Sequence, residues 1–409
     1  MSEWQELQVK DLIQQGIIEK PLDGNHGEIH PKGEDFVASG IPFVMASDIN
    51  EGKVDLESCK FITEQQASSL RKGFAKAGDV LLTHKASLGR TALVPRLDTD
   101  YIMLTPQVTY YRIKDKARLL NSYLKYYFDS PFFQDTLINH GDAGSTRAYI
   151  GITAQHELPI ILPPLPEQKA IASVLSSLDD KIDLLHRQNK TLEAMAETLF
   201  RQLFIEEAKE DWEELSVSDI AIHIKDNVNP SKDPLKTFYH FSLPAFDSGQ
   251  KPTSELGSEI LSNKYRVSKN SILVSKLNPR VPRIWLVSNV EANYVCSTEF
   301  QNLKPKVIAH LMFLYSLFNS RDVIDELTMS ASGTSGSHQR VKPEDMLNIT
   351  FRTPSLDYLE QYSSLIAPSM QKVASNKQQI QTLENLRDTL LPKLMSGEVR
   401  VQYQTEEVA

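Results

Sequence analysis

The sequence predicts an α+β protein in which two similar α+β domains, arranged with pseudo-two-fold symmetry, are joined by two long antiparallel coiled-coil helices. Two observations carry this prediction. Short segments recur after about half the chain, and two long stretches have apolar residues in heptad spacing. Because the repeated unit is far longer than a solenoid repeat, we expect two copies of one domain-plus-helix unit.

The repeat is visible in loops and in helices alike. Ala143-Gly144-Ser145-Thr146 returns as Ser332-Gly333-Thr334-Ser335, 189 positions later. Thr191-Leu192-Glu193 returns as Thr382-Leu383-Glu384, 191 positions later. We therefore divide the 409 residues into four parts: α+β domains at 1–162 and 212–352, a central helix within 163–211, and a C-terminal helix and tail within 353–409.

The two α+β domains show the same order of predicted elements. Short runs of apolar and β-branched residues indicate strands, and longer stretches with helical spacing indicate a helix. In the first copy we expect strands at 79–83, 92–94 and 107–111 and a helix over 121–138, broken at Pro131. In the second copy we expect a strand at 271–274 and a helix over 309–327.

Both helical parts carry apolar residues in steps of three and four, the pattern of a coiled-coil seam. Asn189 occupies one seam position of the first helix, where it would cost stability but help to fix the register. Arg387 interrupts the series of the second helix, and Gly397 is a plausible C-terminal stop. The predicted seam comprises Ile171, Leu175, Leu178, Ile182, Leu185, Asn189, Leu192, Leu199, Val373, Ile380, Leu383 and Leu390.

Pairing of these two helices within the chain is the favoured interpretation. A helix over 166–205 would span ~60 Å, and it could not bury its seam alone. The alternative is that each helix packs only on its own globular domain.

Composition narrows the class of protein. A hydrophobic fraction of 41% and a charged fraction of 24% are ordinary for a globular chain. The chain has no run of 18 apolar residues, and its N-terminus lacks the pattern of a signal peptide, so we expect a cytoplasmic protein with no membrane contact. Two cysteines, Cys59 and Cys296, exclude a disulfide scaffold, and we expect both to be buried.

Catalytic motifs are missing from the sequence. It contains no GxxxxGK[ST] phosphate loop, no GxGxxG fingerprint, no HExxH and no metal-spaced Cys/His cluster. We therefore expect neither catalytic residues nor a bound metal. His84, His140 and His338 lie in polar sequence, and we expect them to be ordinary surface histidines.

Positive charge gathers at equivalent places in the two copies, although the net charge of the chain is −9. The stretch 264–283 holds six basic residues and no acidic one, and the stretch 60–96 holds seven basic against two acidic. Cations, hydroxyls and amides in loops are the groups that contact phosphates and base edges, although a solvated loop is the ordinary alternative. The predicted DNA-binding residues are Lys85, Ser87, Arg90, Thr146, Arg147, Lys276, Asn278, Arg280, Arg283, His338 and Arg340.

Several segments resemble a known family. The run Leu158-Pro159-Ile160-Ile161-Leu162-Pro163-Pro164-Leu165-Pro166-Glu167-Gln168, which continues into the heptads, is similar to the conserved region of specificity (S) subunits of type I restriction-modification enzymes. Gly78 to Leu82, Leu88-Gly89-Arg90 and the tail Leu390 to Val399 resemble further stretches of that family. The second copy departs from the pattern, because Leu356 to Gln361 replaces the proline-rich start.

The resemblance implies two target-recognition domains that each read one half of a bipartite, asymmetric sequence in double-stranded DNA. It also implies that the helices dock two methyltransferase (modification) subunits, to which endonuclease/translocase (restriction) subunits can be added. S-adenosylmethionine and ATP would then belong to these partners, and this chain would bind no cofactor and catalyse no reaction.

Two other classes remain open from the sequence alone. The chain could be an adaptor that uses its coiled coil and α+β domains to assemble protein partners without DNA, which the negative net charge favours slightly. An enzyme in its own right is the least favoured class.

Overall fold

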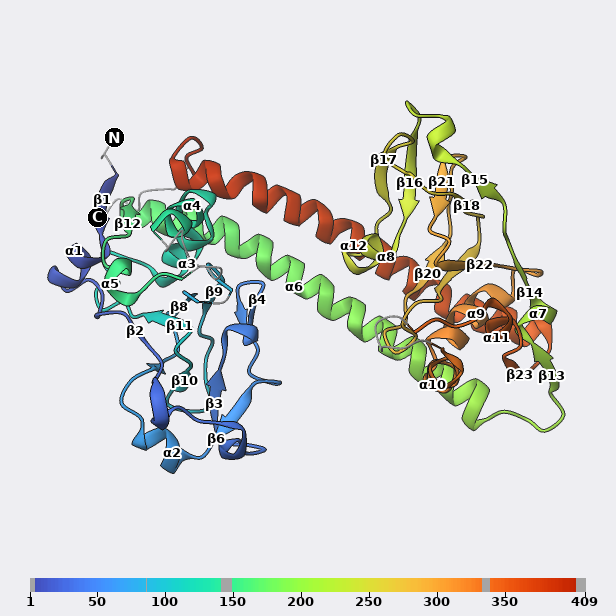
Figure 1. The fold of residues 1–409 in the computed structure, drawn as a ribbon, viewed down its shortest axis with the longest axis horizontal. Coiled ribbons are helices and arrows are strands. Elements are labelled where there is room, and N and C mark those ends of the chain that lie inside the picture. Colours follow the sequence, from blue (N-terminus) through green and yellow to red (C-terminus); the bar gives the residue numbers. More distant parts are fainter. Residues whose placement is uncertain (1–3, 86, 141–148, 333–338, 402–409) are drawn as a thin grey trace, which may run out of the picture. The chain divides into compact units, whose positions relative to one another are not determined.

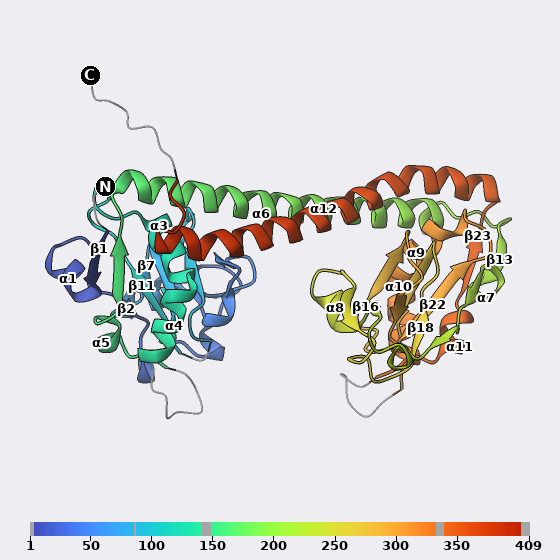
Figure 2. The ribbon, with the colours of Figure 1, turned by 90° about the horizontal axis from the view of Figure 1, so that it is seen from above.

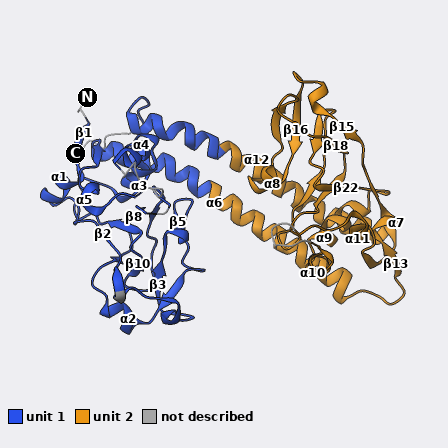
Figure 3. Cartoon of the chain, viewed as in Figure 1, with its two compact units in different colours: residues 1–181, 383–409 blue, residues 182–382 orange. Residues whose placement is uncertain are grey.

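The computed structural model of the chain describes residues 4–85, 87–140, 149–332 and 339–401. Its contacts divide the chain into two compact units, one formed by residues 1–181 and 383–409 and the other by residues 182–382 (Figure 3). We call them unit 1 and unit 2. Each unit therefore combines one globular domain with a segment of both long helices, because the unit boundaries fall inside those helices.

Unit 1 contains two four-stranded sheets, with strand orders β2-β11-β8-β9 and β6-β3-β10-β7, a two-stranded sheet β1-β12 and the hairpin β4-β5. The strands are β1 Gln5–Gln8, β2 Leu22–Asp23, β3 Ile41–Val44, β4 Ile49–Asn50, β5 Lys53–Val54, β6 Lys60–Ile62, β7 Phe74–Ala75, β8 Val80–Thr83, β9 Thr91–Leu93, β10 Ile102–Leu104, β11 Val108–Tyr111 and β12 Pro159–Leu162. The short helices are α1 Val9–Gln14, α2 Glu64–Ser69, α3 Asn121–Asp129, α4 Pro131–His140 and α5 Ile152–Gln155.

Unit 2 contains a four-stranded sheet of order β14-β22-β19-β20, a five-stranded sheet β15-β18-β21-β16-β17 and a two-stranded sheet β13-β23. The strands are β13 Glu213–Ser216, β14 Ala221–His223, β15 Asn227–Val228, β16 Thr237–Phe241, β17 Thr253–Leu256, β18 Lys264–Arg266, β19 Ser271–Ser275, β20 Ile284–Val287, β21 Tyr294–Cys296, β22 Phe300–Pro305 and β23 Thr350–Thr353. The short helices are α7 Val217–Ile220, α8 Leu243–Asp247, α9 His310–Asn319, α10 Arg321–Ser330 and α11 Pro343–Leu347.

The two units repeat the same sheet topology. In each, a central strand pairs antiparallel with two neighbours: β8 with β9 and β11 in unit 1, and β19 with β20 and β22 in unit 2. Each second sheet contains one parallel pair, β3 with β10 and β16 with β21. This repetition confirms the prediction of two copies of one α+β fold.

The helix predicted for the first copy is broken before Pro131, as expected, and the helix predicted as continuous in the second copy is also two helices. In unit 1 the break falls at Ser130, before Pro131, and in unit 2 at Ser320. At both breaks the serine hydroxyl donates a 2.6 Å hydrogen bond to a carbonyl three residues earlier, Tyr127 and Leu317 respectively. The serine satisfies a carbonyl that the ending helix leaves free, which is why the break recurs in unit 2 without a proline.

The two long helices are α6 (Leu165–Arg201), followed by a π-helical turn at Gln202–Glu206, and α12 (Leu356–Ser396). Within each unit α12 runs beside α6 in both views (Figures 1 and 2). In unit 1 Asp179 contacts Arg387, and in unit 2 Asn189 contacts Asn376. The partner number on α12 falls as the number on α6 rises, so the predicted antiparallel pairing is confirmed.

The ends of the helices follow the expected chemistry. α6 begins one residue after Pro163-Pro164. α12 ends before Gly397, whose φ of 74° lies in the left-handed region that favours glycine, so the predicted stop is confirmed.

Each unit buries a core shared between its domain and the helix pair. In unit 1 the core joins Leu82 and Tyr111 of the sheet to Ile171 of α6 and Leu394 of α12. In unit 2 aromatic side chains join these parts: Phe200 of α6 and Phe204 of the π-helical turn that follows it pack against Phe313 of α9 and Tyr362 of α12. Neither long helix therefore packs on one domain alone.

Both cysteines are free and buried, as the sequence predicted. Among the helices that the structure describes, none has the length and apolarity needed to cross a membrane.

Candidate nucleic-acid interface

In unit 1 the predicted DNA-binding residues Lys85, Ser87 and Arg90 lie on the tight connection between β8 and β9, residues 84–90. Thr83 organises it: its hydroxyl donates to the carbonyl of Ser87, and its oxygen accepts from the backbone N–H of Arg90 at 2.9 Å. Gly89, with φ of 88°, completes the turn by donating its N–H to the Thr83 carbonyl at 2.9 Å. Lys85 is exposed and Ser87 half-buried on this loop.

The structure places Tyr149 and Ile150 against this loop. Lys85 forms an isolated antiparallel bridge with Tyr149, and its Nζ lies 5.8 Å from the centroid of the Tyr149 ring. The N–H of Ile150 donates to the carbonyl of His84 at 3.1 Å. Thr146 and Arg147, which were predicted to contact DNA, lie outside the described residues.

Arg90 is exposed but turned partly toward the protein. Its Nη1 donates to Oδ1 of Asn50 at 2.8 Å and lies 3.3–3.4 Å from the carbonyls of Ala46 and Ile49. Arg90 therefore holds the start of the β4-β5 hairpin while the rest of its guanidinium is available to a ligand.

The prediction that His84 is a surface histidine is wrong. Its side chain is 2% exposed, and its Nδ1 lies 2.8 Å from the hydroxyl of Thr109. Burial is the main cause that lowers the pKa of His84 to about 4, against the opposing effect of Asp23. A neutral imidazole therefore lies directly beneath the cationic loop.

In unit 2 the equivalent loop connects β19 to β20 and spans residues 276–283. Residues 339–341 lie against it. Leu277 bridges Arg340, the N–H of Asn278 donates to the carbonyl of Gln339 at 2.9 Å, and the N–H of Val341 donates to the carbonyl of Lys276 at 2.9 Å. Asn278 has a φ of 49°, a left-handed conformation that asparagine tolerates better than most residues. His338 lies outside the described residues.

The predicted cationic residues of unit 2 differ in whether an acidic side chain pairs with them. Arg283 forms a two-pronged ion pair with Asp247, at 2.7 and 2.9 Å, and its side chain is 15% exposed. Arg340 is more exposed and is paired with Glu299 at 3.2 Å. Within the described part of the chain no ion pair involves Lys276 or Arg280, so these two present uncompensated positive charge.

The predicted seam residues of both helices are buried or half-buried. Ile171, Leu175, Ile182, Leu185, Asn189, Val373 and Ile380 are buried, and Leu178, Leu192, Leu199, Leu383 and Leu390 are half-buried. The sequence analysis missed Asn376, which is fully buried and pairs with Asn189. A signal was available, because Asn376 stands one heptad before Leu383.

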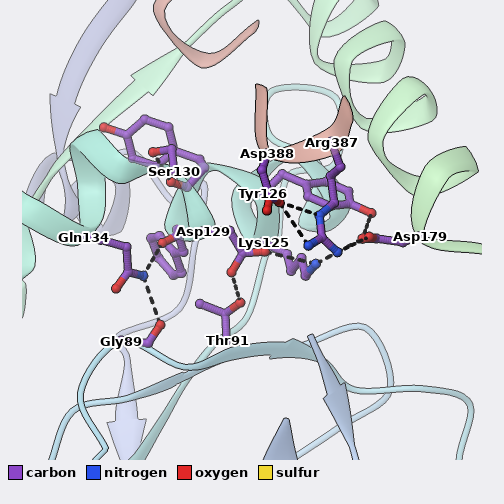
Figure 4. A network of polar contacts seen from close by, with 12 residues as sticks. Gly89, Thr91, Lys125, Tyr126, Asp129, Ser130, Gln134, Asp179, Arg387 and Asp388 are labelled. Atoms are coloured by element: carbon purple, nitrogen blue, oxygen red, sulfur yellow. Dashed lines mark hydrogen bonds and ion pairs between the residues drawn. The ribbon is translucent and has the colours of Figure 1, made fainter. Parts of the chain in front are cut away.

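Arg387, which interrupts the apolar series, has a partner across the seam of unit 1. Its Nη1 lies 3.0 Å from Oδ1 of Asp179, and Oδ2 of the same carboxylate accepts from the hydroxyl of Tyr126 at 2.7 Å and lies 3.5 Å from Nζ of Lys125 (Figure 4). Asp179 of α6 thus joins α12 to α3 of the domain.

The same network reaches the base of the cationic loop of unit 1 (Figure 4). Lys125 lies 3.0 Å from Asp129, whose other oxygen accepts from the hydroxyl of Thr91 at the start of β9. Gln134 of α4 donates to the carbonyl of Gly89 at 2.9 Å. A chain of polar contacts therefore fixes the β8–β9 loop relative to the helix pair within unit 1.

No group of three or more histidine, cysteine or acidic side chains in the described ranges is placed to hold a metal ion.

Comparison with known proteins agrees with this architecture. A family model described as the type I restriction modification DNA specificity domain matches residues 1–194 and 209–385. The specificity subunit of the type I restriction enzyme MjaIX of Methanocaldococcus jannaschii is 26% identical over 379 residues, covering 83% of this chain and 82% of the relative. The specificity subunit of the HindI enzyme of Haemophilus influenzae is 25% identical over 189 residues, or 44% of this chain and 40% of the relative.

A solved structure supports the fold independently of sequence. The crystal structure of the S subunit of a type I restriction-modification system from M. genitalium superposes with a TM-score of 0.64 at 16% identity, covering 98% of this chain and 97% of that one. The family model matches most of the chain in two successive segments. The chain therefore belongs to the specificity subunits of type I restriction-modification systems, the non-catalytic subunits of DNA recognition, and carries two copies of their specificity domain.

Proposed function

We propose that this chain reads a bipartite, asymmetric DNA target, one half with each unit, and docks modification and restriction subunits on its helices. The observation that carries the proposal is the repeated construction of the cationic loops. In both units the connection between two equivalent strands, 84–90 or 276–283, forms a β-bridge with a residue distant in sequence. That residue is Tyr149 in unit 1 and Arg340 in unit 2.

The groups on these loops suit a nucleic acid. Lys85, Lys276 and Arg280 offer positive charge to phosphates, and Asn278 and Arg340 carry the forked groups that match base edges. The two loops share their framework but not their side chains: His84 and Lys85 of unit 1 stand where unit 2 has Lys276 and Leu277. Different side chains on the same framework are expected to read different half-sites, so the target is asymmetric.

The long helices offer apolar side chains on their outer faces. Leu184 and Met195 of α6 and Leu365 and Leu386 of α12 are 40–54% exposed. We assign these exposed apolar side chains to the docking of modification subunits. S-adenosylmethionine and ATP then act in those partners.

Selection from a pool of random duplexes, with the modification subunit present, tests the proposal. We expect enrichment of a sequence in two specified parts separated by an unspecified gap. Recovery of a single continuous site would contradict the bipartite interpretation, and no enrichment at all would favour an adaptor that assembles proteins without DNA.

Variants then assign each half to its unit. Lys276→Ala combined with Arg280→Ala should weaken binding and relax the half-site read by unit 2, at a cost of about 1–3 kcal/mol for each contact made to a base. The half-site read by unit 1 should keep its specificity. Lys209→Ala, an exposed charge outside both loops, serves as the control and should leave the selected sequence and the affinity unchanged.

A further inference from the structure

Two polar pairs, one buried and one partly buried, interrupt the apolar seam between α6 and α12. In unit 2 the side chains of Asn189 and Asn376 are 6% and 0% exposed, and Nδ2 of Asn376 donates to Oδ1 of Asn189 at 2.9 Å. In unit 1 the partly buried pair of Asp179 and Arg387 stands at 3.0 Å. Each pair therefore joins α6 to α12, although Oδ1 of Asn376 has no hydrogen-bond partner among the described residues and Arg387 also contacts Asp388 of its own helix.

The internal repeat shows what each helix would offer to a copy of itself. Residues of α6 and α12 correspond at an offset of 191, as the repeated Thr-Leu-Glu segment shows. At this offset Asn376 corresponds to Leu185, and Asn189 corresponds to Ile380. Both of these apolar residues are buried, with exposures of 1% and 6%.

Pairing of two identical helices in the same register would therefore separate the asparagines. Between two copies of α6, Asn189 would face Leu185 at two places. Between two copies of α12, Asn376 would face Ile380 at two places. A buried amide without a partner loses its hydrogen bond and keeps its desolvation penalty, which lowers the association constant by about tenfold for each amide.

The charged pair of Asp179 and Arg387 leads to the same conclusion independently. Asp179 corresponds to Met370 and Arg387 corresponds to Ala196, both buried at 5% and 7% exposure. Two copies of α6 would place the Asp179 carboxylate against Ala196, and two copies of α12 would place the Arg387 guanidinium against Met370. Only the pairing of α6 with α12 matches both polar pairs.

We propose that these two pairs select the partner of each helix: they make α6 pair with α12 and reject a second copy of α6 or α12 from another chain. Because α6 and α12 are similar in sequence, each helix could also pair with the identical helix of a second chain. Two chains could then exchange helices and form a dimer. The polar pairs disfavour such a dimer, because pairing of identical helices would leave their polar side chains without partners. Single buried asparagines act in the same way in coiled coils.

Relocating one asparagine in the full-length chain tests this proposal. The variant L185N/N376L keeps the composition of the seam but moves an amide from α12 to α6. Two copies of this α6 can match amide to amide at both places, whereas pairing with its own α12 leaves two amides unmatched. After unfolding in urea and refolding at high concentration, we expect the ratio of two-chain to one-chain species, measured by light scattering during size exclusion, to rise at least about tenfold over the wild type.

A matched control moves the amides but keeps the preference of α6 for α12. L185N/N189L/N376L/I380N moves both amides to the equivalent positions, where they face each other only between α6 and α12, so the wild-type ratio is expected. An unchanged ratio in L185N/N376L would overturn the proposal.

A second variant covers the case in which L185N/N376L does not fold. N189L/N376L has an entirely apolar contact at this place, and replacing both partners of a buried hydrogen bond is well tolerated. It should fold with an undiminished thermal midpoint and show more two-chain species than the wild type. The wild-type ratio in this folded variant would equally overturn the proposal.

Discussion

His84 is a titratable side chain whose environment is set by residues distant in sequence. It follows a buried strand, accepts Ile150 at its backbone carbonyl and lies against Thr109, so its imidazole is enclosed beneath the loop that carries Lys85. Burial lowers the pKa of His84 to about 4, so the side chain is neutral in the folded chain near neutral pH.

This lowered pKa predicts a loss of stability in acid. Unfolded His84 would take up a proton at its usual pKa of about 6.5, whereas the folded side chain resists it until about pH 4, so falling pH favours the unfolded chain across this window. Between pH 7.5 and pH 5 the contribution amounts to about 2 kcal/mol. Urea denaturation at the two pH values should show a smaller loss for His84→Gln than for the wild type.

The exposed His186 of α6 supplies the control for that measurement. His186→Gln should keep the wild-type dependence on pH. An equal dependence in His84→Gln and the wild type would assign the acid sensitivity to other groups, of which the half-buried His223, with a pKa lowered to about 4 by burial, is the first to test.

At the level of single residues, sequence could identify the kind of side chain but not its surroundings. The alternation of cations and hydroxyls marks both loops, and the structure places Tyr149 and Ile150 against the first and residues 339–341 against the second. That Arg283 is bound by Asp247 could not be predicted, because the two residues lie 36 positions apart on different elements. The burial of His84 was missed for the same reason, since its neighbours in sequence are polar and its covering residues are distant.

Among the elements, the polar network of unit 1 joins α3, α6 and α12 through one carboxylate. Asp179 receives the Tyr126 hydroxyl, the Arg387 guanidinium and the Lys125 ammonium, and its side chain is 25% exposed. A group shared by three donors on two other elements contributes more than an isolated surface pair, because its removal takes one partner from Lys125 and Arg387 and the acceptor from the Tyr126 hydroxyl.

Asp179→Ala should therefore lower the free energy of unfolding of unit 1 by about 2–3 kcal/mol. Thermal or urea denaturation measures the loss. The control is Asp388→Ala, because Asp388 contacts the same arginine at 3.0 Å but is 65% exposed, so its loss should cost at most about 1 kcal/mol. Equal effects of the two substitutions would show that the shared carboxylate has no special role.

Sequence predicted the long elements much better than the sheets. The heptad pattern is local and sustained over many turns, so it indicated both helices. The strands are short and pair across long separations, as β1 does with β12 and β13 with β23, so no local pattern could specify the sheets. Asn376 was overlooked, although it stands one heptad before Leu383, because a polar residue interrupts the apolar pattern.

For the molecule as a whole, the net charge of −9 and the proposed contact with DNA make salt an informative variable. If the paired loops neutralise about six phosphates, the logarithm of affinity should fall with the logarithm of salt concentration with a slope near −5. Fluorescence anisotropy on a labelled duplex over a range of salt concentrations measures this slope. A slope near zero would contradict phosphate contacts by the loops.

The division of α6 and α12 between the units has a consequence for biosynthesis. Leu391, Leu394 and Met395 belong to the core of unit 1, although the rest of that core is translated first. At about 5–20 residues per second the ribosome needs roughly 10–40 s to proceed from residue 182 to the end of α12. During that interval the nascent N-terminal domain waits with an open apolar face, and a transcript interrupted before codon 383 would leave it without its last segment.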